Sequence, residues 1–306
     1  MLIVSLPPIH QEELLKKIIS HPLVGAVRYN TGMDSAYSPE ETLNKILVLT
    51  KKHDKILYID LKGPQLRVAE WSLPPYGPII LNHNIEVELP AKVYFRGDKV
   101  CELKEIVDGN KIFVDPLPRY GVGRGQAINI VGKKVKVKGL LTENDKDYIK
   151  AAVEKNIYNF MLSFVESLAY IASLENFLQL CGISSEKCKI ILKIESKAGM
   201  EFIQDSLVPS LKNYHLMAAR DDLMIQVGRL ETFGALRTII QKDPWAICAS
   251  RLLLGLESEK NEISLADISD IELMRSYGYK NFMFSDGISL RYFDKAIEFW
   301  KEYVPF

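Results

Sequence analysis

The chain has 306 residues, of which 47% are hydrophobic and 25% are charged. These proportions are typical of a globular protein with a sizeable core, and they exclude intrinsic disorder and collagen-like repeats. The 39 basic and 39 acidic side chains cancel, so bulk charge gives no reason to expect nucleic acid or an anionic membrane as a partner.

Short β-rich runs alternate with amphipathic stretches of helical periodicity, the pattern expected of repeated βα units around a parallel sheet. We count eight such units. In chain order the predicted strands are residues 2–6, 25–30, 55–63, 159–165, 189–195, 215–222, 245–250 and 281–286. Helix-start signals such as Ser38-Pro39-Glu40-Glu41 and Thr142-Glu143-Asn144-Asp145 follow several of them, and the last predicted helix covers residues 290–303.

Residues 68–138 break this rhythm, because they contain β-like pieces separated by Gly, Pro, Asn and Asp but no convincing helix. These pieces are residues 85–95, 111–117, 127–132 and 133–139. We predict an α/β fold, a (β/α)₈ TIM barrel formed by residues 1–67 and 139–306, with a small β-barrel-like domain of residues 68–138 inserted after strand 3. The active site of such a barrel lies at the carboxyl ends of its strands.

Several features point to the reducing interior of a cell. No apolar run approaches the roughly 18 residues of a membrane-spanning helix, and the start, MLIVSLPPIHQEELLKK, lacks the basic-then-apolar order of a signal peptide. The four cysteines form no CxxC pair and are expected to be reduced thiols. The five histidines show no paired metal spacing, which argues against a histidine-built zinc site. We therefore expect a cytoplasmic protein.

Polar side chains stand where the predicted strands end. They are Arg28, Asn30, Asp60, Lys62, Lys193, Glu195 and Asp222. Lys193 and Glu195 are two residues apart in one strand, so they point to the same side. Glu195 and Asp222 are suited to hold Mg²⁺ or Mn²⁺, and Lys193 is suited to stabilise an oxyanion or a phosphoryl charge. An interior salt-bridge network is the alternative interpretation of the same residues.

Four segments together resemble the pyruvate kinase family. They are DLKGPQLRV (60–68), KGLLTENDKDYIKAAVEKNIYNFMLSFV (138–165), KIILKIESKAG (189–199) and HLMAARDDL (215–223). The resemblance extends, with gaps, over nearly the whole chain. It implies a barrel with a small β-domain after its third strand, and a metal-dependent phosphotransferase acting on phosphoenolpyruvate, or a close analogue, and a nucleoside diphosphate. Because the chain stops where the eighth barrel helix should finish, we expect no C-terminal allosteric domain.

The resemblance also implies roles for individual residues on the phosphoenolpyruvate side. Lys193 falls on the lysine that stabilises the transferring phosphoryl group and the enolate, and Arg28 falls on an arginine that contacts the phosphoryl group. Glu195 and Asp222 fall on the two carboxylates that hold the divalent ion. Ser250 stands where the family has a threonine hydroxyl implicated in protonating the enolate.

The nucleotide and monovalent-cation side departs further from the family. Asn30 and Asp60 stand at positions that bind K⁺, but Gly32, Leu61 and Gln65 replace other residues linked to that site, so the sequence does not support K⁺ binding. The resemblance leaves Arg67, together with Asn30, as the candidate nucleotide contact.

Asp221 replaces a glycine at the helix start where the family receives the substrate carboxylate. An aspartate there adds like charge unless its side chain turns away or joins the metal. Either the carboxylate is held differently, or the substrate is not phosphoenolpyruvate.

Three functions are compatible with this pattern. The first is a phosphotransferase of pyruvate kinase type. The second is a metal-dependent enolate-forming lyase or aldolase on a 2-oxo acid such as pyruvate, and the third is a non-catalytic pyruvate kinase-like binding protein. The expected partners are a small anionic substrate and a nucleotide. The aromatic cluster at residues 292–300 either packs the last helix on the barrel or marks a contact between subunits of a homo-oligomer.

Overall fold

The structure is a computed structural model that describes residues 1–33, 35–95, 100–119, 121–205 and 213–303. It forms two compact units. The barrel unit comprises Met1–Leu61 and Glu143–Phe306, and the β unit comprises Lys62–Thr142.

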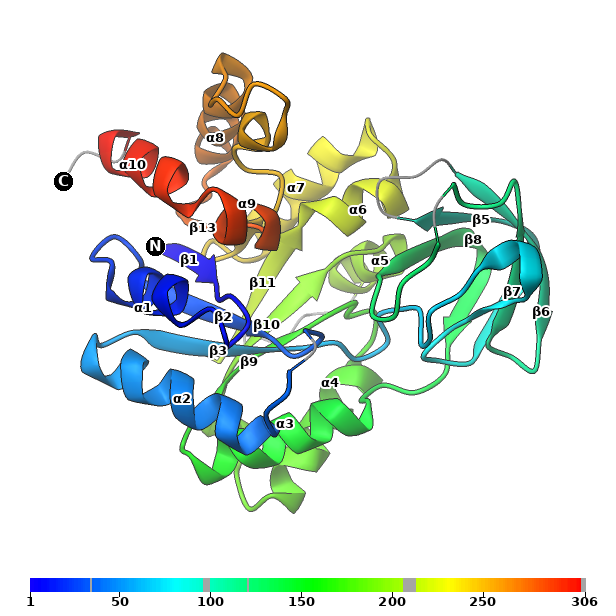
Figure 1. The fold of residues 1–306 in the computed structure, drawn as a ribbon, viewed down its shortest axis with the longest axis horizontal. Helices are drawn as coiled ribbons and strands as arrows, with labels where there is room; N and C mark the ends of the chain where they lie inside the picture. The colour runs from blue at the N-terminus through cyan, green and yellow to red at the C-terminus, as the bar shows by residue number, and fades with distance from the viewer. Residues whose placement is uncertain (34, 96–99, 120, 206–212, 304–306) are drawn as a thin grey trace. The chain divides into compact units, whose positions relative to one another are not determined.

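Eight parallel strands close the barrel unit in the order β1-β13-β12-β11-β10-β9-β3-β2 (Figure 1). They are β1 (Leu2–Ser5), β2 (Ala26–Asn30), β3 (Ile56–Leu61), β9 (Asn159–Leu162), β10 (Lys189–Ile194), β11 (Tyr214–Ala219), β12 (Ile247–Ala249) and β13 (Asn281–Met283). Each overlaps one strand predicted from the sequence, and the predicted TIM barrel is confirmed.

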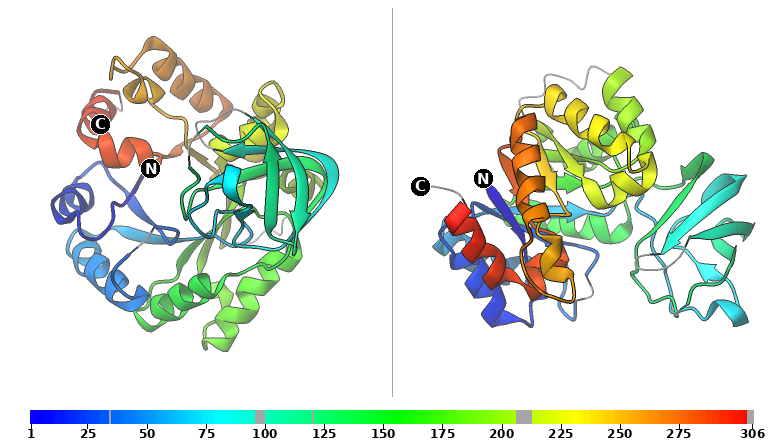
Figure 2. Two further views of the ribbon diagram at one scale, coloured as in Figure 1. Left: turned by 45° about the vertical axis from the view of Figure 1, so that its right-hand side comes forward. Right: turned by 90° about the horizontal axis from the view of Figure 1, so that it is seen from above.

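Helices surround these strands (Figure 2). They are α1 (Glu12–Ser20), α2 (Pro39–Lys52), α3 (Glu143–Glu154), α4 (Leu168–Leu180), α5 (Lys197–Asp205), α6 (Arg220–Val227), α7 (Glu231–Lys242), α8 (Leu265–Tyr277), α9 (Asp286–Arg291) and α10 (Phe293–Tyr303). At the start of α2 the predicted signal forms a capping box, in which Ser38 Oγ accepts from the backbone N–H of Glu41 at 3.2 Å and Glu41 Oε2 accepts from that of Ser38 at 3.0 Å.

Most strands end earlier than the sequence pattern predicts, and after β11 and β13 the chain turns into a helix within the predicted strand. Strand β11 stops at Ala219, and the polar residues after it, including Asp221 and Asp222, form the first turn of α6. Carboxylates are favourable in the first turn of a helix, which explains why the chain changes conformation there. Strand β13 likewise stops at Met283, and Asp286 begins α9.

The last helix packs on the barrel through its aromatic side chains. The ring of Trp300 lies 5.5 Å from that of Phe282 and 5.6 Å from that of Phe284, both edge-on. These contacts account for part of the aromatic cluster at residues 292–300, and a contact between subunits stays a prediction. Among the described residues, no helix is long and apolar enough to cross a membrane.

The β unit contains a five-stranded sheet of order β4-β7-β6-β5-β8, in which every pairing is antiparallel. Its strands are β4 (Ile79–Ile80), β5 (Ile85–Phe95), β6 (Cys101–Val107), β7 (Lys111–Asp115) and β8 (Ile128–Val137). Two pieces separated in the sequence analysis, 127–132 and 133–139, join in the single strand β8, and β6 was not anticipated. The sheet's buried core includes Val93, Ile112 and Ile130.

Candidate active site

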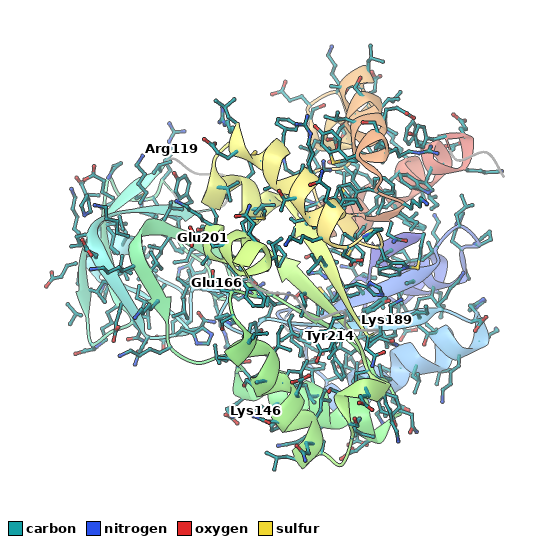
Figure 3. The ribbon with its side chains drawn as sticks, turned by 180° about the vertical axis from the view of Figure 1, so that it is seen from behind. Arg119, Lys146, Glu166, Lys189, Glu201 and Tyr214 are labelled. Carbon is teal, nitrogen blue, oxygen red and sulfur yellow. The ribbon has the colours of Figure 1, made fainter. Side chains whose placement is uncertain are left out.

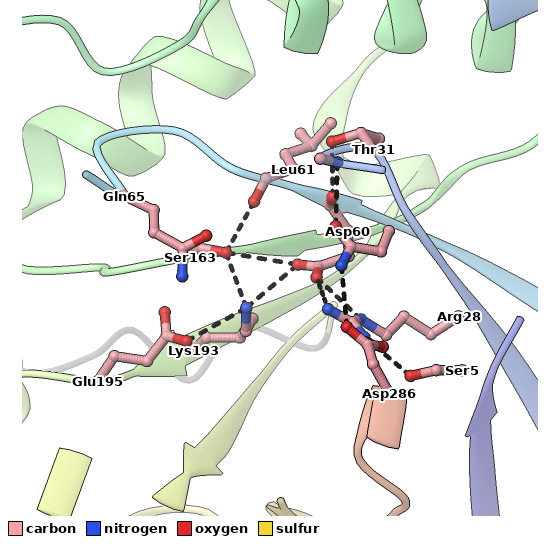
Figure 4. Close-up of polar contacts among 12 residues, drawn as sticks. Ser5, Arg28, Thr31, Asp60, Leu61, Gln65, Ser163, Lys193, Glu195 and Asp286 are labelled. Atoms are coloured by element: carbon pink, nitrogen blue, oxygen red, sulfur yellow. Dashed lines mark hydrogen bonds and ion pairs between the residues drawn. The ribbon is translucent and has the colours of Figure 1, made fainter. Parts of the chain in front are cut away.

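A polar layer lies on top of an apolar layer inside the barrel. The apolar layer is built by Ile3, Ala26, Tyr58, Met161 and Ile191, one from each of five strands. Side chains two residues apart along a strand face the same side, so the next inward position of each strand follows directly. Those positions are Ser5, Arg28, Asp60, Ser163 and Lys193, all buried. The sequence therefore assembles a polar cluster at the carboxyl end of the barrel (Figure 4).

Asp60 is at the centre of this cluster and is fully buried. Its Oδ2 accepts hydrogen bonds from Arg28 Nε at 2.8 Å and Arg28 Nη2 at 2.5 Å. Its Oδ1 lies 3.3 Å from Lys193 Nζ and 3.4 Å from Ser163 Oγ. One carboxylate thus holds two cations from strands β2 and β10.

Lys193 has three oxygen neighbours. Its Nζ donates to Ser163 Oγ at 2.7 Å and lies 3.2 Å from Glu195 Oε1, in addition to the contact with Asp60. Burial lowers the pKa of Lys193, but the carboxylates of Asp60 and Glu195 raise it more, so the net shift is upward. The side chain is therefore a fixed ammonium charge at neutral pH.

Glu195 is buried beside Lys193, and the charge of Asp222 acts on it. Its Oε2 accepts from the backbone N–H of Phe164 at 2.6 Å, and Phe164 adopts a left-handed conformation (φ 52°) to present that N–H. Burial raises the pKa of Glu195 to about 7, with repulsion from Asp222 in the same direction, while Lys193 and the Phe164 N–H act against the shift. The charges of Glu195 and Asp222 thus oppose each other.

Arg28 lies between two carboxylates. Besides its bonds to Asp60, its Nη1 donates to Ser5 Oγ at 2.8 Å and to Asp286 Oδ1 at 2.5 Å. Burial lowers the pKa of Arg28, but Asp286 and Asp60 outweigh burial and raise it. Asp286 also accepts from Asn30 Nδ2 at 3.0 Å through Oδ2, so this carboxylate bridges the two polar side chains of β2.

The composition of the cluster suits a divalent cation. Two cations, Arg28 and Lys193, face four carboxylates, those of Asp60, Glu195, Asp222 and Asp286. Mg²⁺ is commonly held by one or two carboxylates, with water and substrate oxygens completing its shell. Glu195 and Asp222 fit that donor set, and a cation between them would relieve the repulsion that raises the pKa of Glu195. Among the described ranges, no group of three or more His, Cys, Asp or Glu side chains is arranged to hold a metal by itself.

The oxygens at the family's monovalent-cation position accept hydrogen bonds from donors within the chain. Both carboxylate oxygens of Asp60 receive cationic donors, from Arg28 and from Lys193. Asn30 Oδ1 accepts from the backbone N–H of Gly32 at 3.0 Å. These oxygens already serve internal donors, and the loss of the K⁺ site stays a prediction from the sequence.

Ser250 lies just beyond β12 in an unusual backbone segment. Ser250 and Arg251 both adopt left-handed conformations, with φ of 65° and 56°, which non-glycine residues rarely do. The backbone carbonyl of Ser250 accepts from Arg220 Nε at 3.0 Å and Arg220 Nη2 at 2.7 Å. The same guanidinium binds both carboxylate oxygens of Asp270 on α8, at 2.8 and 2.9 Å, and so fixes this loop.

The side chain of Asp221 is directed to Arg251. Its Oδ1 lies 3.5 Å from Arg251 Nη1, and both side chains are partly exposed. An arginine from the loop after β12 therefore offsets the negative charge that replaces the family's glycine. This is the first of the possibilities raised by the sequence, in which the aspartate turns towards another partner.

Arg67 and Lys62 belong to the β unit. The guanidinium of Arg67 donates to Gln65 Oε1 at 2.8 Å and to the carbonyl oxygen of Gly125 at 2.6 Å. Lys62, another strand-end candidate, is buried.

Sequence reasoning missed Ser5, Ser163, Asp286 and Arg220 as parts of the cluster or its support. A signal for three of them was present. Ser5 and Ser163 follow inward-facing apolar residues by two positions, and Asp286 ends the eighth predicted strand. No local signal marked Arg220 as the partner of Ser250, because 30 residues separate them.

Comparison with known proteins gives consistent results. The family model "Pyruvate kinase, barrel domain" matches residues 81–274. A pyruvate kinase of Thermoplasma acidophilum is 28% identical over 286 residues, covering 87% of this chain and 50% of the relative. One of Methanocaldococcus jannaschii is 26% identical over 239 residues, with 74% and 50% covered. One of Borreliella burgdorferi is 27% identical over 229 residues, with 67% and 45% covered. The chain thus spans about half the length of the curated relatives it matches, and it belongs to the pyruvate kinase family.

Proposed function

We propose that this protein is a metal-dependent phosphotransferase of pyruvate kinase type, which moves a phosphoryl group between phosphoenolpyruvate, or a close analogue, and a nucleoside diphosphate. The observation that carries the proposal is the buried ammonium of Lys193. It is held between Asp60, Ser163 and Glu195 at the carboxyl end of the barrel. Such a fixed charge can stabilise negative charge that develops in a transition state without reorganising.

The proposed reaction breaks the bond between phosphorus and the enol oxygen, and forms a bond from phosphorus to a terminal oxygen of the nucleoside diphosphate. Lys193 neutralises charge on the transferring group and on the enolate oxygen left behind. Arg28 contacts the phosphoryl group. A proton added at the enolate carbon then gives the 2-oxo acid, and the Ser250 hydroxyl supports that transfer.

We propose Mg²⁺ or Mn²⁺ as the cofactor, held by Glu195 and Asp222. When bound, the ion supplies Lewis-acid stabilisation of the substrate oxygens. Glu195 and Asp222 would hold the ion, and the ammonium of Lys193 would bind the anionic substrate. Asp221 lies next to Asp222 at this helix start, and its pairing with Arg251 offsets its charge where the substrate carboxylate would approach.

For the nucleotide we propose Arg67 as a phosphate contact, because its guanidinium carries a permanent charge in a planar fork suited to phosphate. Asn30 is the second candidate, and its amide now donates to Asp286. A cytoplasmic location agrees with this substrate class and with the four free thiols.

One observation favours a second candidate function, an enolate-forming lyase or aldolase on a 2-oxo acid. Arg28, the proposed phosphoryl contact, is bound by Asp286 as well as by Asp60. A 2-oxo acid without phosphate would use Lys193, Glu195 and Asp222 and leave this arrangement in place. Metal-dependent exchange of pyruvate methyl protons with deuterated water, unaffected by nucleotide, is the result expected for this second function.

The test of the first function is the release of pyruvate from phosphoenolpyruvate by the full chain with Mg²⁺ and ADP or GDP. We expect pyruvate formation that requires both metal and nucleotide and that Lys193→Ala abolishes. Formation at the same rate in Lys193→Ala would remove the assigned role of Lys193. Absence of both turnover and Mn²⁺ binding would instead favour the non-catalytic binding protein.

A further inference from the structure

Asp286 has contacts that the family resemblance does not explain. Its Oδ1 accepts from Arg28 Nη1 at 2.5 Å, and its Oδ2 accepts from Asn30 Nδ2 at 3.0 Å. The residue begins α9 directly after the eighth barrel strand, in the segment Ser285-Asp286-Gly287-Ile288. The close-up shows its carboxylate directed towards Arg28 (Figure 4).

The two carboxylates that hold Arg28 differ in their access to water. The side chain of Asp60 is 0% exposed and also binds Lys193, so its removal would leave two buried cations without a partner. The side chain of Asp286 is 34% exposed. An anion that reaches Arg28 from solvent therefore displaces Asp286 and leaves Asp60 in place.

Asp286 presents to Arg28 the same chemistry as a phosphoryl group, an anionic oxygen at hydrogen-bond distance. A phosphate and the Asp286 carboxylate cannot both occupy Nη1, since like charges at such a distance repel strongly. Ser5 Oγ takes the other contact of Nη1 at 2.8 Å. The free chain thus carries its own anion at the position where the proposed substrate would place one.

We propose that Asp286 is a specificity-determining residue, an internal anion that competes with phosphate-bearing ligands for Arg28. It weakens binding of any ligand whose phosphoryl group must contact Arg28, and it leaves ligands that use only Lys193, Glu195 and Asp222 unaffected. The inference rests on the proposed function only in taking Arg28 as the phosphoryl contact.

The test is calorimetric titration of the full, metal-free chain with inorganic phosphate. The variant Asp286→Asn keeps the size of the side chain and an oxygen acceptor for Arg28 while removing the charge. Asp294→Asn is the matched control, because it removes an equal charge from a side chain that pairs with Lys17 on the barrel exterior. We expect Asp286→Asn to bind phosphate about tenfold more tightly than the wild type, and Asp294→Asn to bind as the wild type does.

A double variant, Arg28→Gln with Asp286→Asn, shows whether the increase in phosphate affinity depends on Arg28. We expect the double variant to bind phosphate no more tightly than the wild type. Equal or weaker phosphate binding by Asp286→Asn would overturn the proposal, as would a gain that persists without Arg28. Should Asp286→Asn fail to fold by circular dichroism, Asp286→Ser takes its place with the same criteria. A wild-type chain that transfers no phosphoryl group would refute the proposed function and leave this phosphate result standing.

Discussion

Lys193 and Asp60 face each other across strand β9, with 3.3 Å between Nζ and Oδ1. Their strands, β10 and β3, both pair with β9 and do not pair with each other. Since Asp60 also binds Arg28, the two cations proposed to contact the phosphoryl group are spaced by one buried carboxylate. Positioning of this kind is most of what phosphoryl transfer requires from a protein.

Replacement of Lys193 by alanine should reduce phosphoryl transfer by at least about 100-fold, the usual effect of removing one preorganised charge or donor. Lys189→Ala is the matched control. Lys189 lies at the other end of the same strand, with its ammonium 3.8 Å from the centroid of the Trp245 ring (Figure 3). Steady-state rates with phosphoenolpyruvate and nucleotide measure the effect, and circular dichroism verifies folding. Similar rate losses in both variants would count against the assignment.

Glu195→Gln and Asp222→Asn should each weaken Mn²⁺ binding at least about tenfold, because each removes a charged oxygen ligand. Electron paramagnetic resonance of free Mn²⁺ gives the affinity directly. The control is Glu201→Gln on α5, whose side chain is exposed (Figure 3). If all three variants bound Mn²⁺ as the wild type does, the metal would be held elsewhere.

Arg220→Met should lower the free energy of unfolding by about 3 kcal/mol, because it leaves the carbonyl of Ser250 and the carboxylate of Asp270 without their shared donor. Arg220→Lys keeps the positive charge but loses the planar guanidinium that binds two acceptors at once. We therefore expect it to destabilise the protein less than Arg220→Met does. Urea denaturation measures both. Arg237→Met, which removes an exposed arginine beside Tyr277 on the outer surface, should change stability by less than about 1 kcal/mol.

Asp243 should make part of the free energy of unfolding depend on pH in the acidic range. Its carboxylate accepts from the backbone N–H of Leu216 at 2.7 Å and of Trp245 at 2.9 Å. Partial burial raises the pKa of Asp243. Contacts with His215 and with these N–H groups outweigh burial, so the pKa lies below the ordinary 3.8.

Because the pKa of Asp243 is lower in the folded state than in the unfolded state, the ionised carboxylate stabilises the fold. This contribution to the free energy of unfolding is present above pH about 4 and is lost as the pH falls through the pKa of the folded state. Asp243→Asn should therefore cost about 1–2 kcal/mol at pH 7 and progressively less below pH 4. Urea denaturation at a series of pH values tests this difference. A cost that stays constant down to pH 2 would show that the charge of Asp243 is not responsible.

The sequence predicted the barrel because each strand is an apolar run with a polar end, and because the intervening segments have helical periodicity. It also predicted that Lys193 and Glu195 share a side, since residues two apart in a strand must. The contact between Lys193 and Asp60 could not be derived in this way. It depends on the pairing of β3 and β10 with the two sides of β9, which brings together residues 133 positions apart.

The direction of the Asp221 side chain could not be predicted from the neighbouring sequence either. It depends on Arg251, which another strand's loop supplies in a left-handed conformation. The hydroxyls of Ser5 and Ser163 could have been found by stepping two residues along each inward face. The partnership of Asp286 with Arg28 required the barrel to close between its first and last strands.

The most direct test of the account is ³¹P nuclear magnetic resonance of phosphoenolpyruvate incubated with the full chain, Mg²⁺ and ADP or GDP, because it follows the phosphorus atom itself. We predict a growing nucleoside triphosphate signal with the wild type and with Lys189→Ala, and none with Lys193→Ala. A spectrum that stays unchanged with the wild type, or that shows only inorganic phosphate, would contradict phosphoryl transfer at this site.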